Sequence, residues 1–327
     1  MIDLHLHFDG SLLPRTILEL AREQQLPLPA EDPDELKLFL SAPEDCESLN
    51  EYLEKFDLPL SVLQTKEAIR KAMYTLLSSL KEQGMLYAEV RFAPQSHLRK
   101  GLTQEDAVKA AILGMQEATA GSFFMAKLIL CCMRGGDNQE ANRKTIETAA
   151  AFLGRGVAAV DLAGAEALFP TADYEELFAY AKDLGLPFTI HAGEADGPES
   201  IETALRFGAA RIGHGVRANE DEKVLELLRE SQIPLEMCPT SNVQTKAVSS
   251  FLEHPILRYL RSGLKVTVNT DNMTVSDTTI EREYRRLKTE LGMTEEERKV
   301  LLFNAADAAF LTEEERGRMK DVIGQVV

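Results

Sequence analysis

Eight short apolar runs, most of them separated by amphipathic helical stretches, are the feature of this sequence that most restricts its fold. The runs have the length and apolar character of buried strands, whereas the stretches between them repeat apolar residues at helical spacing. The expected strands span residues 2–8, 86–92, 124–133, 157–162, 187–192, 210–215, 233–238 and 265–270. This alternation predicts an α/β fold in which a parallel sheet closes into a (β/α)8 TIM barrel.

One interval departs from the alternation. Residues 30–80 lie between the first and second expected strands, are rich in helical patterns and contain prolines at positions 33, 43 and 59. We interpret this segment as a helical insertion that covers the mouth of the barrel, and the tail after about residue 290 as extra C-terminal helices. Because no linker, repeat or low-complexity tract divides the chain, we expect a single domain over residues 1–327.

Charge and cysteine usage limit the expected partners and compartment. The net charge of −17 argues against nucleic acids and anionic membranes as partners, and no apolar run approaches the length of a membrane span. The four cysteines, at positions 46, 131, 132 and 238, have no CxxC spacing and fit a reducing cytoplasm. A cleavable leader is not expected, because its removal would also remove His5 and His7, two candidate metal ligands.

These two histidines, His5 and His7, lie in the stretch "HLHFDGS" on the first expected strand. Residues two apart on a strand point to the same face, and neutral imidazole is an excellent metal ligand. The pair alone is weak evidence, because ordinary half-buried strand histidines can have the same spacing.

The ends of other expected strands supply the rest of a metal site. His191 and His214 end the fifth and sixth strands, and Asp271 follows the eighth. In a barrel these side chains converge on one mouth, which a scattering of core histidines would not do. Three imidazoles and one carboxylate, with a position left for water, suit zinc. The expected ligands are His5, His7, His191 and Asp271.

Two further groups at the same mouth are not among the expected metal ligands. Glu194 follows His191 by three residues, and His214 lies one strand further on. A hydrolytic reaction needs one group to handle the proton of the attacking water and another to protonate the accepting nitrogen. Glu194 and His214 can fill these two roles.

The motifs "HLHFDGS", "DLAG", "HAGE", "IGHG", "CPTSN" and "NTD", in that order, resemble the adenosine deaminase family of the amidohydrolase superfamily. The resemblance runs from residue 2 to about residue 310. It implies hydrolytic deamination of adenosine or 2′-deoxyadenosine to inosine or 2′-deoxyinosine and ammonia, at one Zn²⁺ per chain, in purine salvage. The implied partner is a small purine nucleoside, and the oligomeric state stays open.

The resemblance also implies roles for individual residues. Glu194 matches the group that protonates purine N1, and His214 matches the residue that orients and deprotonates the attacking water. Gly164 matches a backbone N–H donor to N3, and Asp9 matches a contact to the ribose 5′-hydroxyl. The full expected set is Glu194, His214 and Asp271 in catalysis, with His7, Asp9, Gly164 and Asn272 in contact with the substrate.

Asn272 is a departure from the family pattern. Many members have a second aspartate after Asp271, which hydrogen-bonds purine N7, whereas this chain reads "NTDNMT". Because N7 is an acceptor, a carboxylate must be protonated to bond it, while an asparagine amide donates without any added proton. We therefore expect Asn272 to keep the bond and remove one charge from the pocket.

Alternatives remain at the level of substrate and class. A modified adenine nucleoside, such as methylthioadenosine or aminodeoxyfutalosine, would use the same chemistry. Adenine is another alternative, although Asp9 with Gly10 and Ser11 favours a nucleoside, because the family's adenine deaminases usually have Glu-Gly there. A binuclear amidohydrolase needs a bridging lysine after the fourth strand, and "VAAVDLAG" has none. A catalytically dead binding protein would have lost a ligand or Glu194, and none is lost.

The remaining candidates are expected to be structural. Glu89 and Arg91 on the second strand are expected in a buried network behind the site, and "CPTSN" at 238–242 is expected to brace the mouth. His97, after Pro94, is expected to be structural. His254, before Pro255, is expected at the surface, at the start of a helix.

Overall fold

The strands of the computed structural model, which describes residues 1–43 and 46–326, form two parallel four-stranded sheets, β1 to β4 and β5 to β8. All eight expected strands are confirmed, although the last four are shorter than expected, and β7 and β8 have three residues each. The strands are β1 Ile2–His7, β2 Tyr87–Phe92, β3 Met125–Met133, β4 Val157–Ala163, β5 Thr189–Ala192, β6 Arg211–His214, β7 Leu235–Met237 and β8 Val266–Val268.

Two isolated bridges close the sheets into the expected (β/α)8 barrel. Val160 of β4 pairs with Phe188, just before β5, and Leu6 of β1 pairs with Asp271, just after β8. At the second bridge, the His7 N–H donates to the Asp271 carbonyl at 2.7 Å, and the Asp271 N–H donates to the His5 carbonyl at 2.8 Å. The first and last strands are therefore joined at the residues expected to bind metal.

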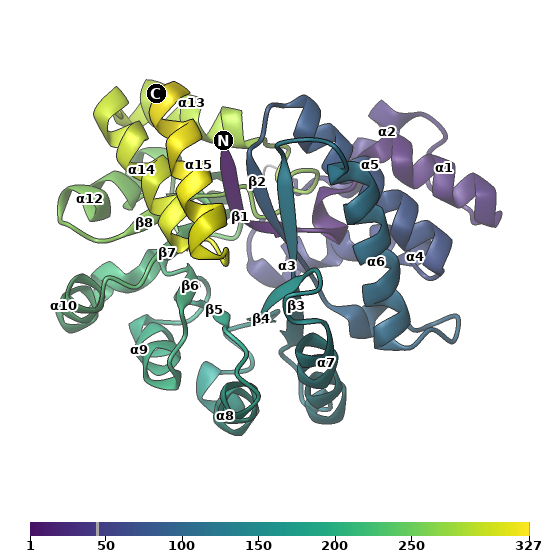
Figure 1. Cartoon of the computed structure of the whole chain (residues 1–327), viewed down its shortest axis with the longest axis horizontal. Helices are drawn as coiled ribbons and strands as arrows, with labels where there is room; N and C mark the ends of the chain where they lie inside the picture. The colour runs from purple at the N-terminus through teal and green to yellow at the C-terminus, as the bar shows by residue number, and fades with distance from the viewer. Residues whose placement is uncertain (44–45, 327) are drawn as a thin grey trace.

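Helices surround the strands, as Figure 1 shows. The helix after β2 has the start expected from the sequence, because Thr103 and Asp106 form a reciprocal capping box. Among the described residues, no helix is both long enough and apolar enough to span a membrane. The ring helices are α5 Lys66–Glu82, α6 Gln104–Thr119, α7 Gln139–Phe152, α8 Glu175–Asp183, α9 Pro198–Phe207, α10 Glu222–Ser231 and α12 Ile256–Arg261.

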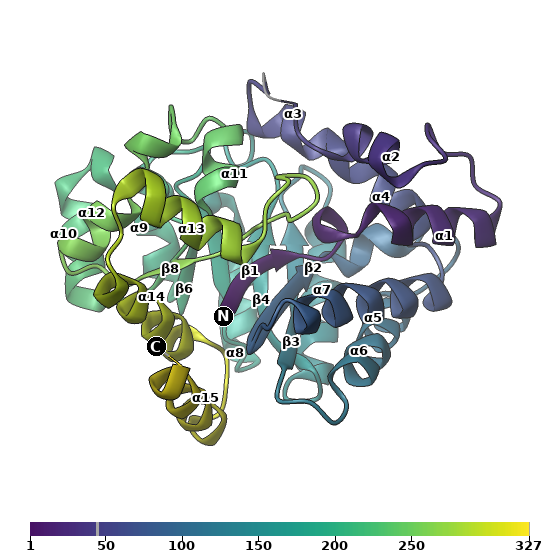
Figure 2. The ribbon, with the colours of Figure 1, turned by 90° about the horizontal axis from the view of Figure 1, so that it is seen from above.

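The chain has further helices besides these seven. Those between β1 and β2 form a separate group in Figure 2, whereas α5 packs along α6, so the extra helices end at Val62, not near residue 80. The expected C-terminal helices are present, and α14 packs against β1 and β8. The additional helices are α1 Pro14–Gln24, α2 Pro33–Leu40, α3 Leu49–Leu53, α4 Asp57–Val62, α11 Pro239–Gln244, α13 Ile280–Leu291, α14 Glu295–Ala308 and α15 Glu313–Val326.

A fully buried arginine ties the strands together inside the barrel. Arg91 of β2 donates to the Asp161 carboxylate of β4 at 2.9 Å, and to the Glu236 carboxylate of β7 and the Leu4 carbonyl of β1, both at 2.7 Å. Glu236 also accepts from Arg211, which in turn donates to Glu89. Buried charges are stable only when paired and hydrogen-bonded, so the expected network around Arg91 and Glu89 is present and links five strands, β1, β2, β4, β6 and β7.

We predict that Arg91→Met lowers the free energy of unfolding by about 3–5 kcal/mol, because it leaves buried carboxylates without their counter-charge. Chemical denaturation of the two metal-loaded proteins measures the difference. The matched control is Arg285→Met, which removes an exposed ion pair with Glu281 on α13 and should change stability little. Equal stability of Arg91→Met and wild type would show that the network does not hold the strands.

Candidate metal centre and active site

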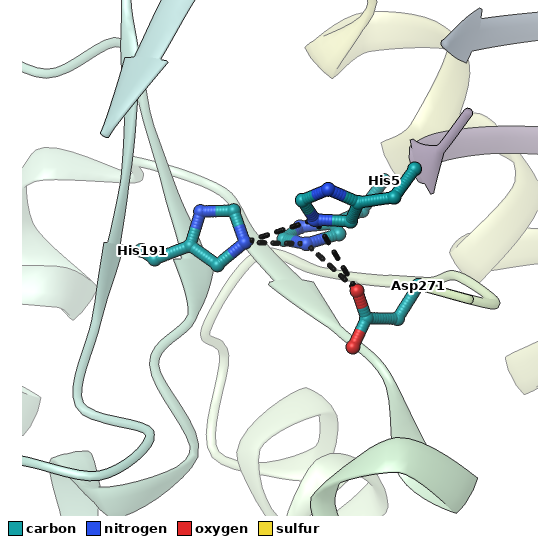
Figure 3. Close-up of side chains that lie close together, drawn as sticks. His5, His191 and Asp271 are labelled. Atoms are coloured by element: carbon teal, nitrogen blue, oxygen red, sulfur yellow. Dashed lines mark hydrogen bonds and ion pairs between the residues drawn. The ribbon is translucent and has the colours of Figure 1, made fainter. Parts of the chain in front are cut away.

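Four side chains that the sequence places hundreds of residues apart meet at one point. Figure 3 shows His5, His191 and Asp271 with their ligand atoms directed toward one another. The Nε2 atom of His191 lies 3.1 Å from that of His5 and 3.2 Å from that of His7. An Asp271 carboxylate oxygen lies 3.5 Å and 3.4 Å from the same two imidazole nitrogens. Ligands that are about 2.0–2.1 Å from a shared Zn²⁺ lie roughly 3–3.5 Å from one another, so this arrangement fits the ion.

Carboxylates behind the histidines set the direction of their lone pairs. The Nδ1 atom of His5 lies 2.8 Å from the Glu236 carboxylate, and that of His191 lies 3.0 Å from the Asp161 carboxylate. A carboxylate accepts the Nδ1 proton, which leaves the Nε2 lone pair free for a metal. Two such lone pairs facing each other repel without a cation between them, so the donor set itself calls for a metal ion.

Electrostatics keep these groups in the forms that bind metal. Burial lowers the pKa of His5 and His7 well below the usual range, and neighbouring positive groups lower both further, so both imidazoles stay neutral. Burial opposes ionisation of Asp161, but His191 and Arg91 outweigh it and lower the pKa of that carboxyl. The charged carboxylate then holds the imidazole in place.

Two of the site residues have a strained backbone. His214 and Asp271 have φ values of 60° and 61°, in the left-handed region that non-glycine residues rarely adopt. Such strain costs about 1–3 kcal/mol per residue and persists where the surroundings enforce it. The Ser241 hydroxyl, which donates to the Asp271 carboxylate at 2.6 Å, and the two backbone bonds to β1 hold Asp271 in this conformation.

His214 and Glu194 lie beside the four potential ligands, as expected. The His214 Nε2 atom is 3.4 Å from the Glu194 carboxylate, and both side chains are buried. Burial raises the pKa of Glu194 well above its usual range, and the nearby Asp271 and Glu166 carboxylates raise it further. A carboxylic acid that keeps its proton near neutral pH can donate that proton to a substrate.

The loop that carries Glu194 is wrapped around another buried carboxylate. Glu166, in the loop after β4, accepts backbone N–H groups from residues 193, 194, 195 and 196 at 2.7–3.0 Å. The Ser200 hydroxyl on α9 donates to it as well, at 2.6 Å. Successive N–H groups that converge in this way form an anion-binding nest, which fixes the direction in which Glu194 points.

One cavity of about 230 Å³ lies above this cluster. His5 is fully buried and lies behind it, whereas the other eight expected site residues line the cavity: His7, Asp9, Gly164, His191 with Glu194, His214, and Asp271 with Asn272. Apolar side chains between β1 and β2, Leu49, Leu53, Phe56 and Leu60, also line it. The helices between the first two strands therefore form one wall of the site.

Asn272 sits at this wall in close contact with the turn after β1. It is 2% exposed, and its Oδ1 atom is buried without a hydrogen-bond partner. A Cβ atom on Gly10 would lie 1.9 Å from that oxygen, so only glycine fits opposite it. The turn in "FDGS" thus has a steric reason for its glycine.

Several residues of the site have roles that sequence reasoning missed or misplaced. The surface position expected for His254 is wrong: the side chain is buried and hydrogen-bonds Asn242, which contacts His214. His97 is structural as expected, with its ring bonded to the Leu63 carbonyl. Glu166 was missed altogether, because an acidic residue in a loop gives no sign of burial. Asp161 and Glu236 were missed as partners of the histidines, although each is a charged residue within an apolar strand.

A parallel eight-stranded barrel with histidine and carboxylate side chains gathered at its strand ends defines a metal-dependent amidohydrolase. The chain belongs to the adenosine deaminase family, whose model, described as "Adenosine deaminase", matches residues 1–326. The adenosine deaminase of Haemophilus ducreyi is 51% identical to this chain over 320 residues, which cover 97% of this chain and 93% of that protein.

Two solved structures have the same fold. The adenine deaminase from Arthrobacter aurescens has a TM-score of 0.90 at 28% identity and covers 99% of this chain and 98% of its own. The arabidopsis N6-mAMP deaminase has a TM-score of 0.87 at 25% identity, with 99% and 97% coverage. The proteins similar to this chain are named for a nucleoside, a base and a nucleotide, so the substrate of this chain has to be argued from its own residues.

We predict that Glu166→Gln accelerates amide hydrogen exchange in residues 193–196, because the amide group replaces one acceptor with a donor that faces N–H groups. A buried donor left unsatisfied costs about 1–3 kcal/mol, so local opening should be easier by a corresponding factor. Exchange measured by mass spectrometry checks this, with Glu202→Gln on the exposed face of α9 as the matched control. Unchanged exchange in that loop would mean that Glu166 does not hold it.

Proposed function

We propose that this protein is a zinc-dependent deaminase that converts adenosine and 2′-deoxyadenosine to inosine and 2′-deoxyinosine, with release of ammonia, in purine salvage. The observation that carries the proposal is the convergence of four metal-ligand atoms, a buried carboxyl group and a histidine at a single site beside the cavity. Membership in the adenosine deaminase family supports it. The four cysteines form no disulfide, which fits the reducing cytoplasm in which purine salvage takes place.

His5, His7, His191 and Asp271 would hold the zinc ion. When bound, the ion lowers the pKa of water and so supplies a nucleophile at neutral pH. His214 orients the attacking oxygen from one side. Glu194, whose carboxyl group lies 3.4 Å from His214 Nε2, donates its proton to purine N1 as the water oxygen adds to C6. One proton of that water passes to the exocyclic amine, which leaves C6 as ammonia, and the other restores the Glu194 carboxyl group.

Three further residues of the cavity would select the substrate. Asn272 donates to N7, the Gly164 N–H donates to N3, and Asp9 accepts from the ribose 5′-hydroxyl. Gly164 has a φ of 109°, which favours glycine. Because glycine has no side chain, a substrate can come close to this N–H. Burial raises the pKa of Asp9 to about 6, so at neutral pH its carboxylate is mostly charged and suited to accept a hydroxyl proton.

The lining of the cavity favours a nucleoside over a nucleotide or a free base. Asp9 and Asp57 both line it, and carboxylates there would repel a 5′-phosphate. A free adenine has no ribose hydroxyl, so the buried Asp9 carboxylate would have no hydrogen bond from the substrate to accept. A 5′-modified nucleoside such as methylthioadenosine is the second candidate, because apolar residues between β1 and β2 also line the cavity.

The direct test is an ultraviolet assay of the zinc-loaded protein on adenosine, 2′-deoxyadenosine, methylthioadenosine, aminodeoxyfutalosine, adenine and AMP. We predict the highest kcat/KM on the first two.

Glu194→Gln should lower kcat about 10²–10⁴-fold, because the amide has no acidic proton to give N1, and its zinc content should not change. Glu226→Gln, an exposed position on α10, is the matched control. Adenosine turnover retained by Glu194→Gln would remove Glu194 from the mechanism, and a preference for adenine or AMP would refute the proposed substrate.

The proposed N7 contact has its own test. We predict that wild type prefers adenosine to 7-deazaadenosine, because the analogue leaves the Asn272 amide unpaired, a penalty of roughly 1–3 kcal/mol. Asn272→Leu should lower kcat/KM on adenosine and reduce this preference, while zinc content stays constant. Asn272→Asp should regain the preference only at pH values where the new carboxyl is protonated. If Asn272→Leu keeps the full preference for adenosine, another group makes the N7 contact.

A further inference from the structure

His254 is a buried histidine that the proposed chemistry leaves without a role. It lies just before α12, is 3% exposed and is separated from His214 by a single side chain, that of Asn242 on α11. Burial lowers the pKa of His254 to about 3. Its imidazole is therefore neutral near pH 7 and carries one ring proton.

The backbone decides which nitrogen of His254 carries that proton. The Ile256 N–H points at the His254 Nδ1 atom, 3.3 Å away, and a backbone N–H can only donate. Because Nδ1 accepts, the ring proton is on Nε2. That Nε2 atom lies 3.1 Å from the Asn242 Oδ1 atom, to which it donates.

The orientation of the Asn242 amide follows. Its Oδ1 atom also lies 3.4 Å from the Cys238 N–H, which again can only donate. The oxygen and nitrogen of an amide must be assigned from their hydrogen bonds, and here two donors from different segments require the oxygen on the same side. The Nδ2 group of Asn242 therefore faces His214.

The last link concerns His214 itself. Asn242 Nδ2 lies 3.0 Å from His214 Nδ1, and an amide nitrogen donates but does not accept. His214 Nδ1 must then accept, so a neutral His214 carries its proton on Nε2. This is the nitrogen that faces the Glu194 carboxylate, 3.4 Å away.

We propose that Asn242 and His254 are positioning residues that hold neutral His214 in the Nε2-protonated tautomer. His214 then presents an N–H donor to the attacking oxygen and has no free lone pair at Nε2 with which to remove a proton from it. This replaces the role of base that the family resemblance implies for His214. The catalytic consequence rests on the proposed deaminase function, whereas the tautomer itself does not.

The tautomer can be observed directly. The chain has six histidines, so imidazole-¹⁵N labelling of the zinc-loaded protein gives a small set of signals, in which protonated and unprotonated ring nitrogens are well separated. The His214 signals are those absent from His214→Gln. We expect a protonated Nε2 and an unprotonated Nδ1 on both His214 and His254. A protonated Nδ1 on His214 would overturn the proposal, whether or not the protein deaminates adenosine.

Asn242→Asp tests the cause. An aspartate has nearly the same shape, but its carboxylate only accepts, so His214 must place a proton on Nδ1. We expect that signal to appear and kcat to fall about 10–100-fold, the usual effect of changing a partner behind a metal-site residue, with KM and zinc content nearly constant. The matched control is Gln244→Glu on the same helix, whose amide contacts the Ser276 carbonyl instead and should leave the His214 signals unchanged. A loss of kcat without a change of tautomer would refute the proposal.

His254 offers a conservative pair of variants. The glutamine of His254→Gln can still donate to Asn242 Oδ1, whereas the leucine of His254→Leu cannot. We expect His254→Gln to keep the His214 tautomer and most of kcat, and His254→Leu to show both tautomers. Equal behaviour of the two folded variants would exclude a role for the His254 donor. If wild type has the expected tautomer but no activity on adenosine, the proposed function fails and the positioning role stands.

Discussion

The barrel closes through the same residues that are placed to bind metal. The backbone of Asp271 is held between His5 and His7 by two hydrogen bonds, at the bridge through which the last strand region pairs with the first. Closure of the barrel and assembly of three of the four ligands are therefore one event. Releasing the left-handed backbone of Asp271 would break these two hydrogen bonds.

The hydrogen bonds behind this junction of the first and last strands fix the orientation of the site residues. Glu236 and Asp161 orient the imidazoles of His5 and His191, and Arg91 holds both carboxylates. Glu166 orients the loop that carries Glu194. The series of hydrogen bonds from the Ile256 N–H through His254 and Asn242 orients His214. For the three histidines, a group that can only donate or only accept determines the proton position of the next one. The site is thus preorganised by hydrogen bonds that do not touch the substrate.

The fold and the first layer of the site could be predicted from the sequence, because both follow from local pattern. Strands buried on both faces read as apolar runs, and His5, His191 and Asp271 stand at their ends. The predicted limits of the short strands, such as β7, are less exact, because the extent of a short strand depends on its pairing with the neighbouring strands. Glu166 and His254 could not be predicted, because their burial depends on loops that only the folded barrel brings together. A histidine before a proline has the same local sequence on a surface as in a core.

The central claim is that His5, His7, His191 and Asp271 form a mononuclear zinc site. Metal analysis of the fully loaded protein together with zinc X-ray absorption spectroscopy tests it most directly, because the spectrum separates sulfur at about 2.3 Å from nitrogen and oxygen at about 2.0–2.1 Å. His214, Cys238 and Asp271 form another group that could hold a metal ion among the described residues, so the distinction is a real one. We expect one zinc per chain with nitrogen and oxygen ligands alone. A sulfur ligand, or two metals per chain, would contradict the assignment.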